Sequence, residues 1–306
     1  MLLLHSVELP IFNTATMKKL VLTLSALLFA ATLSFAQDMA AATQLAKDAQ
    51  DAYTNKEFAQ ALEGFQKALA AAEACGEEGA ELIDQCKTAI PQVAMSIAKE
   101  KINAQDYDGG LAALQQVIEL SDKYSAIDVL AEAKDLIPAV EQQKGNALFA
   151  DAEALYQEGK LQEALTAFQA LKEGGNANAI KRIPTVFLKI AQGAYKEGKL
   201  DDAIAAVQSA VTESGGSAAI KKTAGSIVQG AIQKAATTGK LGDAGKYYGI
   251  LSELDPGNVN LGVLAYTIGA SYYKAKNNGQ AKSWLQKAVN DPKYGANAKQ
   301  LLSAIK

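Results

Sequence analysis

Two stretches of the chain carry almost the same order of apolar, polar and small residues. They read YQEGKLQEALTAF at residues 156–168 and YKEGKLDDAIAAV at residues 195–207. In both, a tyrosine is followed by a glycine three positions on, an alanine five positions after the glycine, and a bulky residue four positions later. The apolar residues fall three and four apart, which predicts helices, and the alternation typical of strands is scarce.

The same order recurs four more times, around residues 53–65, 102–114, 236–248 and 273–285. Gly159, Gly198 and Gly239 are predicted to end a helix in the left-handed conformation, and the chain then turns back. Each copy is therefore predicted to be an antiparallel helix hairpin, whose leftover apolar face packs on the next hairpin. The small residues that let the two helices approach are Ala61, Gly110, Ala164, Ala203, Ala244 and Ala281.

These residues closely resemble the tetratricopeptide repeat (TPR) family, in its exported bacterial form, over roughly residues 40–293. Asp255-Pro256 and Asp291-Pro292 look like the helix-ending Asp-Pro of that family. The chain departs from the family pattern in lacking its first-helix Trp and in carrying Gly110 and Asn278. The resemblance implies an all-α solenoid of six antiparallel hairpins, and a protein that binds other proteins.

The copies are longer than those of the family, because they recur every 37 to 54 residues instead of roughly every 34. An Ile-Pro-x-Val sequence recurs shortly before three of the first helices, with its prolines at Pro91, Pro138 and Pro184. Proline is tolerated in a first helical turn and kinks a helix interior. We therefore expect elongated first helices, or short extra helices joined at a proline bend.

The segment from Met17 to Gln37 has the three parts of a secretory signal peptide. Lys18 and Lys19 precede an apolar run over residues 20–33, and Ser34-Phe35-Ala36 follows. We expect translation to start at Met17 and cleavage to follow Ala36, which leaves residues 37–306 as one repeat domain. The run is shorter than the about 20 residues of a membrane-spanning helix, so a retained anchor is the less favoured alternative. We expect a periplasmic protein, with secretion or association with the outer membrane as alternatives.

Residues 37–306 contain 28 Lys and Arg against 32 Asp and Glu, and Arg182 is their only arginine. A nucleic-acid partner is not expected, because such partners favour several arginines and a basic face. The only histidine, His5, precedes the predicted cleavage point, which excludes catalytic sites and zinc sites built on histidine. No phosphate-binding loop is present, and Asp201-Asp202 and Glu77-Glu78 are read as capping or solvated charges. We expect neither an enzyme nor a cofactor nor a metal.

Two cysteines, Cys75 and Cys86, flank the sequence Gly76-Glu77-Glu78-Gly79. In an oxidising compartment they can form a disulfide. A helix that restarts near Ala80 would place Cys86 almost two turns along it, which makes bridging geometry difficult. A disulfide and two free thiols both remain open.

In a tetratricopeptide array the first helix of each hairpin lines a concave groove, which implies where a partner would bind here. We expect a non-catalytic scaffold or adaptor of the bacterial cell envelope that holds a protein or peptide segment in this groove. The alternative is that the tyrosines pack between hairpins and the glutamines are solvated. The predicted groove residues are Gln50, Tyr53, Lys99, Glu153, Tyr156, Gln192, Tyr195, Lys196, Gln233, Tyr273 and Lys274.

Two other functions are considered. One is a structural protein that self-assembles into homo-oligomers through its last helix, predicted over residues 297–305. The other is a carbohydrate-binding module that uses aromatic rings as sugar platforms. Those rings are Tyr266, Tyr272, Tyr273 and Trp284.

Overall fold

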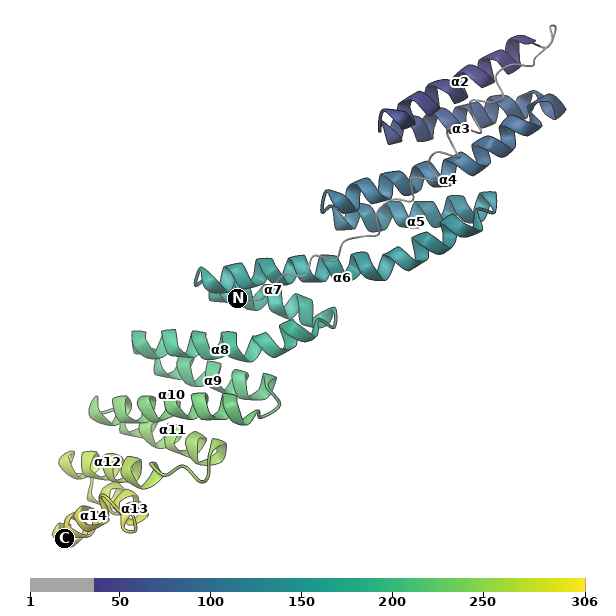
Figure 1. Cartoon of the computed structure of the whole chain (residues 1–306). Coiled ribbons are helices and arrows are strands. Elements are labelled where there is room, and N and C mark those ends of the chain that lie inside the picture. Colours follow the sequence, from purple (N-terminus) through teal and green to yellow (C-terminus); the bar gives the residue numbers. More distant parts are fainter. Residues whose placement is uncertain (1–35, 306) are drawn as a thin grey trace. The chain divides into compact units, whose positions relative to one another are not determined.

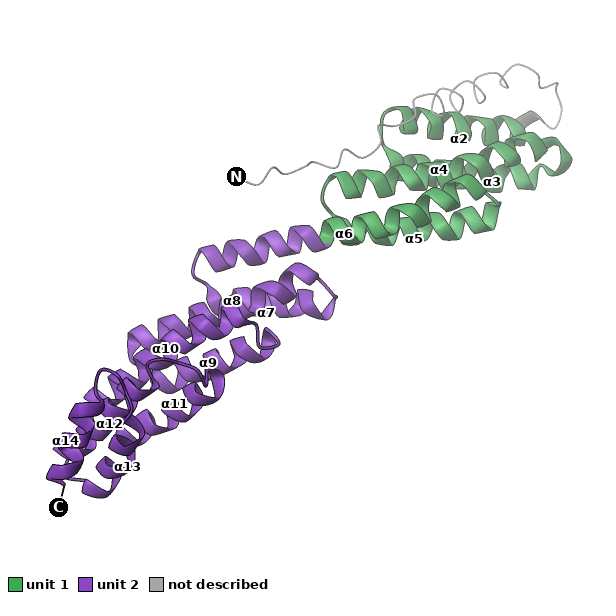
Figure 2. Cartoon of the chain, turned by 60° about the horizontal axis from the view of Figure 1, so that its bottom comes forward, with its two compact units in different colours: residues 1–144 green, residues 145–306 purple. Residues whose placement is uncertain are grey.

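The computed structural model describes residues 36–305, and every regular element in that range is a helix (Figure 1). The all-α prediction is thereby confirmed for this part of the chain. The helices gather into two units, one ending at Lys144 and the other beginning at Gly145 (Figure 2), whereas the sequence analysis treated residues 37–306 as one domain. The predicted signal peptide, the start at Met17 and His5 lie outside the described residues.

Unit 1 is built from helices that pack in consecutive pairs. The pair α2 and α3 stacks on the pair α4 and α5 through contacts between α3 and α4. A single apolar cluster holds them together, and Phe65, Ile90 and Leu114 are fully buried in it. The elements are α2 (Ala36–Thr54), α3 (Phe58–Ala74), the short 3-10 helix η1 (Gly76–Gly79), α4 (Ala80–Asn103), α5 (Tyr107–Tyr124) and the first part of α6 (Ile127–Gln157).

Unit 2 continues the same pairing. After the second part of α6, each pair packs on the next along the chain, and α14 packs on the last pair. Phe168, Ile232 and Leu285 are buried completely in three successive apolar clusters. The helices are α7 (Leu161–Glu173), α8 (Ala177–Glu197), α9 (Leu200–Glu213), α10 (Ala218–Thr237), α11 (Leu241–Leu254), α12 (Leu261–Lys274), α13 (Asn278–Ala288) and α14 (Gly295–Ala304).

The hairpin turns share one backbone geometry. The residue two positions before each second helix has a positive φ, between 59° and 81°. The following residue donates its N–H to the carbonyl five positions earlier, over 2.8–3.0 Å, which satisfies a carbonyl left free at the helix end. The left-handed glycines are confirmed, and three further turns use other residues at the same position. The six residues are Lys56, Gln105, Gly159, Gly198, Gly239 and Lys276.

The small and bulky positions of the repeat form the core, as predicted. All six small residues are buried, and so are the bulky residues in five of the six hairpins. The fifth hairpin differs, because Tyr248 is only half-buried and its neighbour Tyr247 is buried instead. Tyr247 donates a hydrogen bond to Asp201 over 2.8 Å, so this large ring is buried with its hydroxyl group satisfied.

Packing explains why the second hairpin has a glycine where the others have alanine. A Cβ atom added at Gly110 would lie 2.6 Å from Cγ1 of Ile102. That distance is too short for two carbon atoms, since contacts between carbons are optimal near 3.5–4.0 Å. The departure from the repeat pattern at this position therefore accommodates the bulky Ile102 on the facing helix.

The three prolines lie inside long helices, so elongated first helices are the correct alternative. Pro91 is in α4, which has 24 residues, Pro138 is in α6, which has 31, and Pro184 is in α8, which has 21. A proline inside a helix removes one backbone hydrogen bond and bends the axis. Figure 1 shows α4 and α8 changing direction along their length.

The shared turn geometry predicts that introducing a glycine at the left-handed turn position and removing one from it have opposite effects on the free energy of unfolding. Gln105→Gly should raise the free energy of unfolding and Gly159→Ala should lower it, each by about 1 kcal/mol, because a left-handed residue costs least as glycine. Gly193→Ala, in the interior of α8 with open space around it, should raise it by up to about 1 kcal/mol. Urea unfolding followed by circular dichroism measures all three, and equal signs for Gln105→Gly and Gly159→Ala would contradict the assignment.

Candidate functional site

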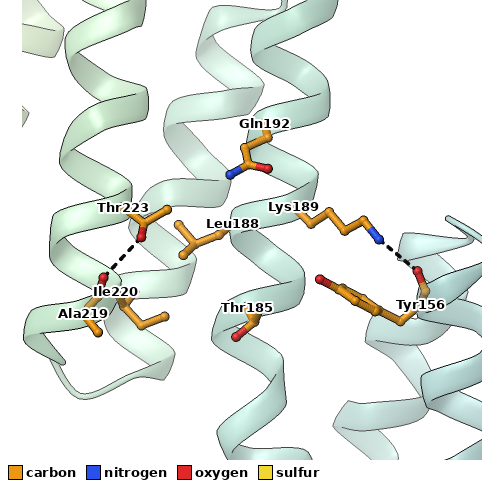
Figure 3. A pocket seen from close by; sticks show the side chains of 8 residues that line it. All are labelled: Tyr156, Thr185, Leu188, Lys189, Gln192, Ala219, Ile220 and Thr223. Carbon is orange, nitrogen blue, oxygen red and sulfur yellow. Dashed lines mark hydrogen bonds between the residues drawn. The ribbon is translucent and has the colours of Figure 1, made fainter.

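A row of side chains on α8 faces a shallow groove in unit 2. Thr185, Lys189, Gln192 and Tyr195 recur three and four residues apart and so share one side of the helix. The first pocket has a volume of about 420 Å³, and Figure 3 shows its side chains converging from α6, α8 and α10. It is lined by Tyr156, Thr185, Leu188, Lys189, Gln192, Ala219, Ile220 and Thr223.

A second pocket adjoins the first, with a volume of about 330 Å³. Gln192 and Thr223 line both pockets, so the two form one continuous depression along consecutive first helices. We call it the unit 2 groove. The second pocket is lined by Gln192, Tyr195, Lys222, Thr223, Ser226 and Ile227.

The unit 2 groove has an apolar floor and a polar rim. Leu188 and Ile227 on the floor are buried, with 6% and 8% of their surface exposed, whereas Gln192, Lys222 and Thr223 on the rim are exposed. The Thr223 hydroxyl donates to the carbonyl of Ala219 over 3.3 Å, and this leaves its oxygen free to accept. The rim therefore offers amide, hydroxyl and ammonium groups beside an apolar surface, the mixture that holds peptide segments.

Two cations lie close to the ring of Tyr156. The Arg182 guanidinium carbon lies 4.1 Å from the centre of the tyrosine ring, and Lys189 Nζ lies 4.0 Å from it. Arg182 also pairs with Glu153, and Lys189 donates a hydrogen bond over 3.2 Å to the Tyr156 carbonyl at the end of α6. A cation at a helix C-terminus and over an aromatic face is stabilising on both counts.

Tyr195 repeats this arrangement one hairpin later. Lys234 of α10 lies 5.4 Å from the centre of the Tyr195 ring, and its Nζ donates to the Tyr195 carbonyl over 3.2 Å. Both tyrosines are half-buried. They join neighbouring hairpins, as the packing alternative proposed, and at the same time each lines one of the two pockets.

The predicted groove residues of unit 1 do not form a comparable surface. Tyr53 is buried against Phe58, with its hydroxyl 3.3 Å from Ser96 Oγ. Both side-chain amide atoms of Gln50 are buried without a hydrogen-bond partner among the described residues. Lys99 forms an ion pair of 2.6 Å with Glu132. These three side chains therefore lie in packing or pairing roles within unit 1.

Of the remaining predicted residues, only Tyr156, Gln192 and Tyr195 line the unit 2 groove. Lys196, Gln233 and Lys274 are exposed and Tyr273 is half-buried, but none of them lines either pocket. The part of the groove that was not predicted lies nearer the N-termini of α8 and α10. Continuing the row of Gln192 and Tyr195 by steps of three and four residues toward the N-terminus of α8 would have found its α8 residues, but not those of α10. The missed residues are Thr185, Leu188, Lys189, Ala219, Ile220, Lys222, Thr223, Ser226 and Ile227.

Other candidate sites of the sequence analysis have local structural roles. Tyr266 stacks on Tyr294 with ring centres 4.7 Å apart, and Trp284 packs edge-on to Tyr248 at 5.0 Å, so two of the four predicted platform rings pack against other aromatic rings. The hydrogen bond from Tyr247, together with Lys246, lowers the pKa of Asp201. Among residues 36–305, no three His, Cys, Asp or Glu side chains gather as metal ligands do.

Cys75 and Cys86 are both free thiols in the structure. Cys75 is half-buried and its Sγ donates to the Ala71 carbonyl over 3.2 Å. Cys86 is 1% exposed, and burial raises its pKa to about 12. Because the thiolate is the reactive form, Cys86 is protected from reaction at neutral pH.

This difference predicts selective labelling. Iodoacetamide at pH 8 should modify Cys75 of the folded, reduced protein at least about tenfold faster than Cys86, since Cys86 is buried and protonated. In about 6 M guanidinium chloride, which unfolds the protein, the two rates should become similar. Peptide mass spectrometry gives both rates, and faster labelling of Cys86 in the folded protein would contradict the assignment.

No helix in the described part of the chain combines the length and the apolar character needed to cross a membrane. Neither a model of a known protein family nor a curated protein sequence matches the chain. Its function is therefore argued from the geometry of its own residues.

Proposed function

We propose that the chain is a tetratricopeptide-type repeat protein that holds a segment of another protein in the unit 2 groove, without catalysis. One observation carries this proposal: two adjoining pockets lie along consecutive first helices and share Gln192 and Thr223. The identical hairpin turns support the assignment to a helical repeat. Surfaces of this kind generally serve recognition of protein segments.

The rim explains how such a segment would be held. An extended peptide has unpaired N–H and C=O groups along its length, and the Gln192 amide and the Thr223 hydroxyl supply partners of both kinds. Leu188, Ile220 and Ile227 offer apolar contact for side chains on the other side of the segment. The groove is shallow, so the partner is better described as an extended segment than as an enclosed small molecule.

The location of the protein is part of the same proposal. The signal-peptide pattern of residues 17–36 favours export and a role in the bacterial envelope, with the periplasm as the first choice. An adaptor in that compartment needs no cofactor, and none is proposed.

The last helix gives little support to self-assembly through its apolar side. Ala298 and Ile305 are buried within the apolar cluster of the final hairpin, so that side of α14 already contacts its own chain. The exposed residues of α14 are small or polar: Ala296, Asn297, Lys299, Gln300, Ser303 and Ala304. The packing of Tyr266 on Tyr294 and of Trp284 on Tyr248 likewise favours a packing role over sugar binding.

The experiment is affinity capture from the envelope fraction, followed by calorimetry with the captured protein. Gln192→Ala together with Thr223→Ala should weaken its binding by about tenfold or more, because two hydrogen-bonding groups are lost from the rim. The matched control is Gln208→Ala with Thr212→Ala, which removes the same two residue types from exposed positions on α9 and should leave the affinity unchanged. Equal affinities for wild type and both variants would reject the unit 2 groove as the binding site.

A further inference from the structure

In the two central hairpins of unit 2, α8–α9 and α10–α11, the charges are sorted between the first and the second helix. The first helices α8, α10 and α12 contain eight Lys and Arg against one acidic residue, Glu197, whereas the part of α6 in unit 2 contains Asp151 and Glu153 and no Lys or Arg. The second helices α7, α9 and α11 contain seven Asp and Glu against two lysines, whereas the last second helix, α13, contains two lysines and no acidic residue. The unit 2 groove therefore lies on a basic layer, and Lys189 and Lys222 of that layer line it.

Unit 1 carries the opposite charge. Residues 36–144 contain 19 Asp and Glu against nine Lys, whereas residues 145–306 contain 19 Lys and Arg against 13 Asp and Glu. The near-neutral total of the whole chain conceals this asymmetry. Over residues 37–306 the two signs nearly balance, which is why no basic face was predicted from the sequence.

The acidic residues of unit 1 lie closest together in the sequence where α3 ends, η1 follows and α4 begins. Five acidic residues lie there, all exposed, and no lysine occurs between Lys67 and Lys87. Within the described residues none of the five forms an ion pair. We call this the acidic corner, and its residues are Glu73, Glu77, Glu78, Glu81 and Asp84.

We propose that the partner of the unit 2 groove is a second copy of this chain, which presents its acidic corner to the basic layer. This inference rests on the proposed function, because it names the partner of the same groove. The acidic corner is folded into η1 and two helix ends, so its carboxylates, instead of unpaired backbone groups, meet the lysines of the groove. Charge complementarity supports it, since the surface of opposite sign that a basic layer selects is present on every copy of the chain. Glu77 and Glu78 then lie opposite Lys196 and Lys222, whose ammonium groups are exposed.

A nucleic acid fits the same layer less well. Phosphate recognition favours the two-pronged guanidinium of arginine, and the layer contains a single arginine, Arg182, which pairs with Glu153. The excess negative charge of unit 1 also repels a long polyanion. A protein surface with localised carboxylates avoids both difficulties.

The first experiment is sedimentation velocity of the purified protein over a range of concentrations. Association is expected in low salt and should weaken by about tenfold or more when the Debye length falls from about 30 Å at 0.01 M to about 8 Å at 0.15 M salt. Lys196→Glu with Lys222→Glu should raise the dissociation constant by about tenfold or more. The control, Lys282→Glu with Lys299→Glu, changes the net charge of unit 2 equally at exposed positions outside the basic layer, and should behave as wild type.

A complementary mixture tests which surfaces meet. The corner variant Glu77→Lys with Glu78→Lys should associate as weakly as the Lys196→Glu, Lys222→Glu variant when each is alone. Mixed together they should associate again, because the intact corner of one fits the intact basic layer of the other. A mixture that stays monomeric, or a corner variant that still associates as wild type, would overturn the proposal.

The remaining outcomes separate the identity of the partner from the function of the groove. The wild-type protein could be monomeric in low salt and yet capture an envelope protein through Gln192 and Thr223. This result would overturn the proposal that the partner is a second copy and would leave the proposed function intact. A monomer that instead binds a 20-nucleotide DNA, a length of about two helical turns, with loss of binding in Lys196→Glu, Lys222→Glu, overturns it in favour of a nucleic acid. A monomer that binds neither overturns both proposals.

Discussion

The described structure depends on closing each helix hairpin through a residue in the left-handed conformation. This single residue sends the chain back on itself, and the hydrogen bond that follows satisfies a carbonyl at the end of the first helix. Once the turn is fixed, the small residue that follows five positions later must face the first helix. The bulky residue a turn further on then fills the space beside it. The core within each pair therefore follows from the turn.

The turn also determines how neighbouring pairs of unit 2 are joined. Because the first helix ends at a defined residue, its last carbonyls lie in the same place in successive hairpins. In two of them a lysine from the next first helix donates to the carbonyl of the tyrosine three positions before the turn. The same lysine covers the ring of that tyrosine. Tyr156 and Tyr195 thus lie at the edge of the groove because they hold the hairpins together.

Much of the fold could be predicted from the sequence because turn and packing positions follow rules that involve neighbouring residues only. Three positions each have a local cause: the glycine at the hairpin turn, the alanine where the two helices approach closely, and the bulky residue four positions after that alanine. The left-handed Lys56, Gln105 and Lys276 were not predicted, since nothing local marks a lysine or glutamine for that conformation. The glycines of the third, fourth and fifth hairpin turns occupy the same position in the repeat. Aligning the other three hairpins with them would have indicated these three residues.

The site could be predicted only in part, because its residues come from three different helices. Tyr156, Gln192 and Tyr195 were found through their fixed distances from the turn. Thr223 and Lys222 lie near the N-terminus of α10, far from its hairpin turn. Their proximity to Gln192 therefore depends on how α8 and α10 pack. The lysine partners of the two tyrosines lie 33 and 39 residues away in the sequence, so these contacts also depend on how the helices pack. The division of charge becomes apparent only when the boundary between the two units is known.

The lysines that join the hairpins have a practical consequence for anyone who labels this protein. Amine-reactive dyes and cross-linkers convert an ammonium group into a neutral amide. At Lys189 or Lys234 that conversion removes the charge from the end of the preceding helix and from the face of its tyrosine. Reductive methylation keeps the charge, and a maleimide on Cys75 avoids these lysines altogether. The choice of label therefore decides whether a fluorescence or cross-linking measurement reports on the native stack of hairpins or on a loosened one.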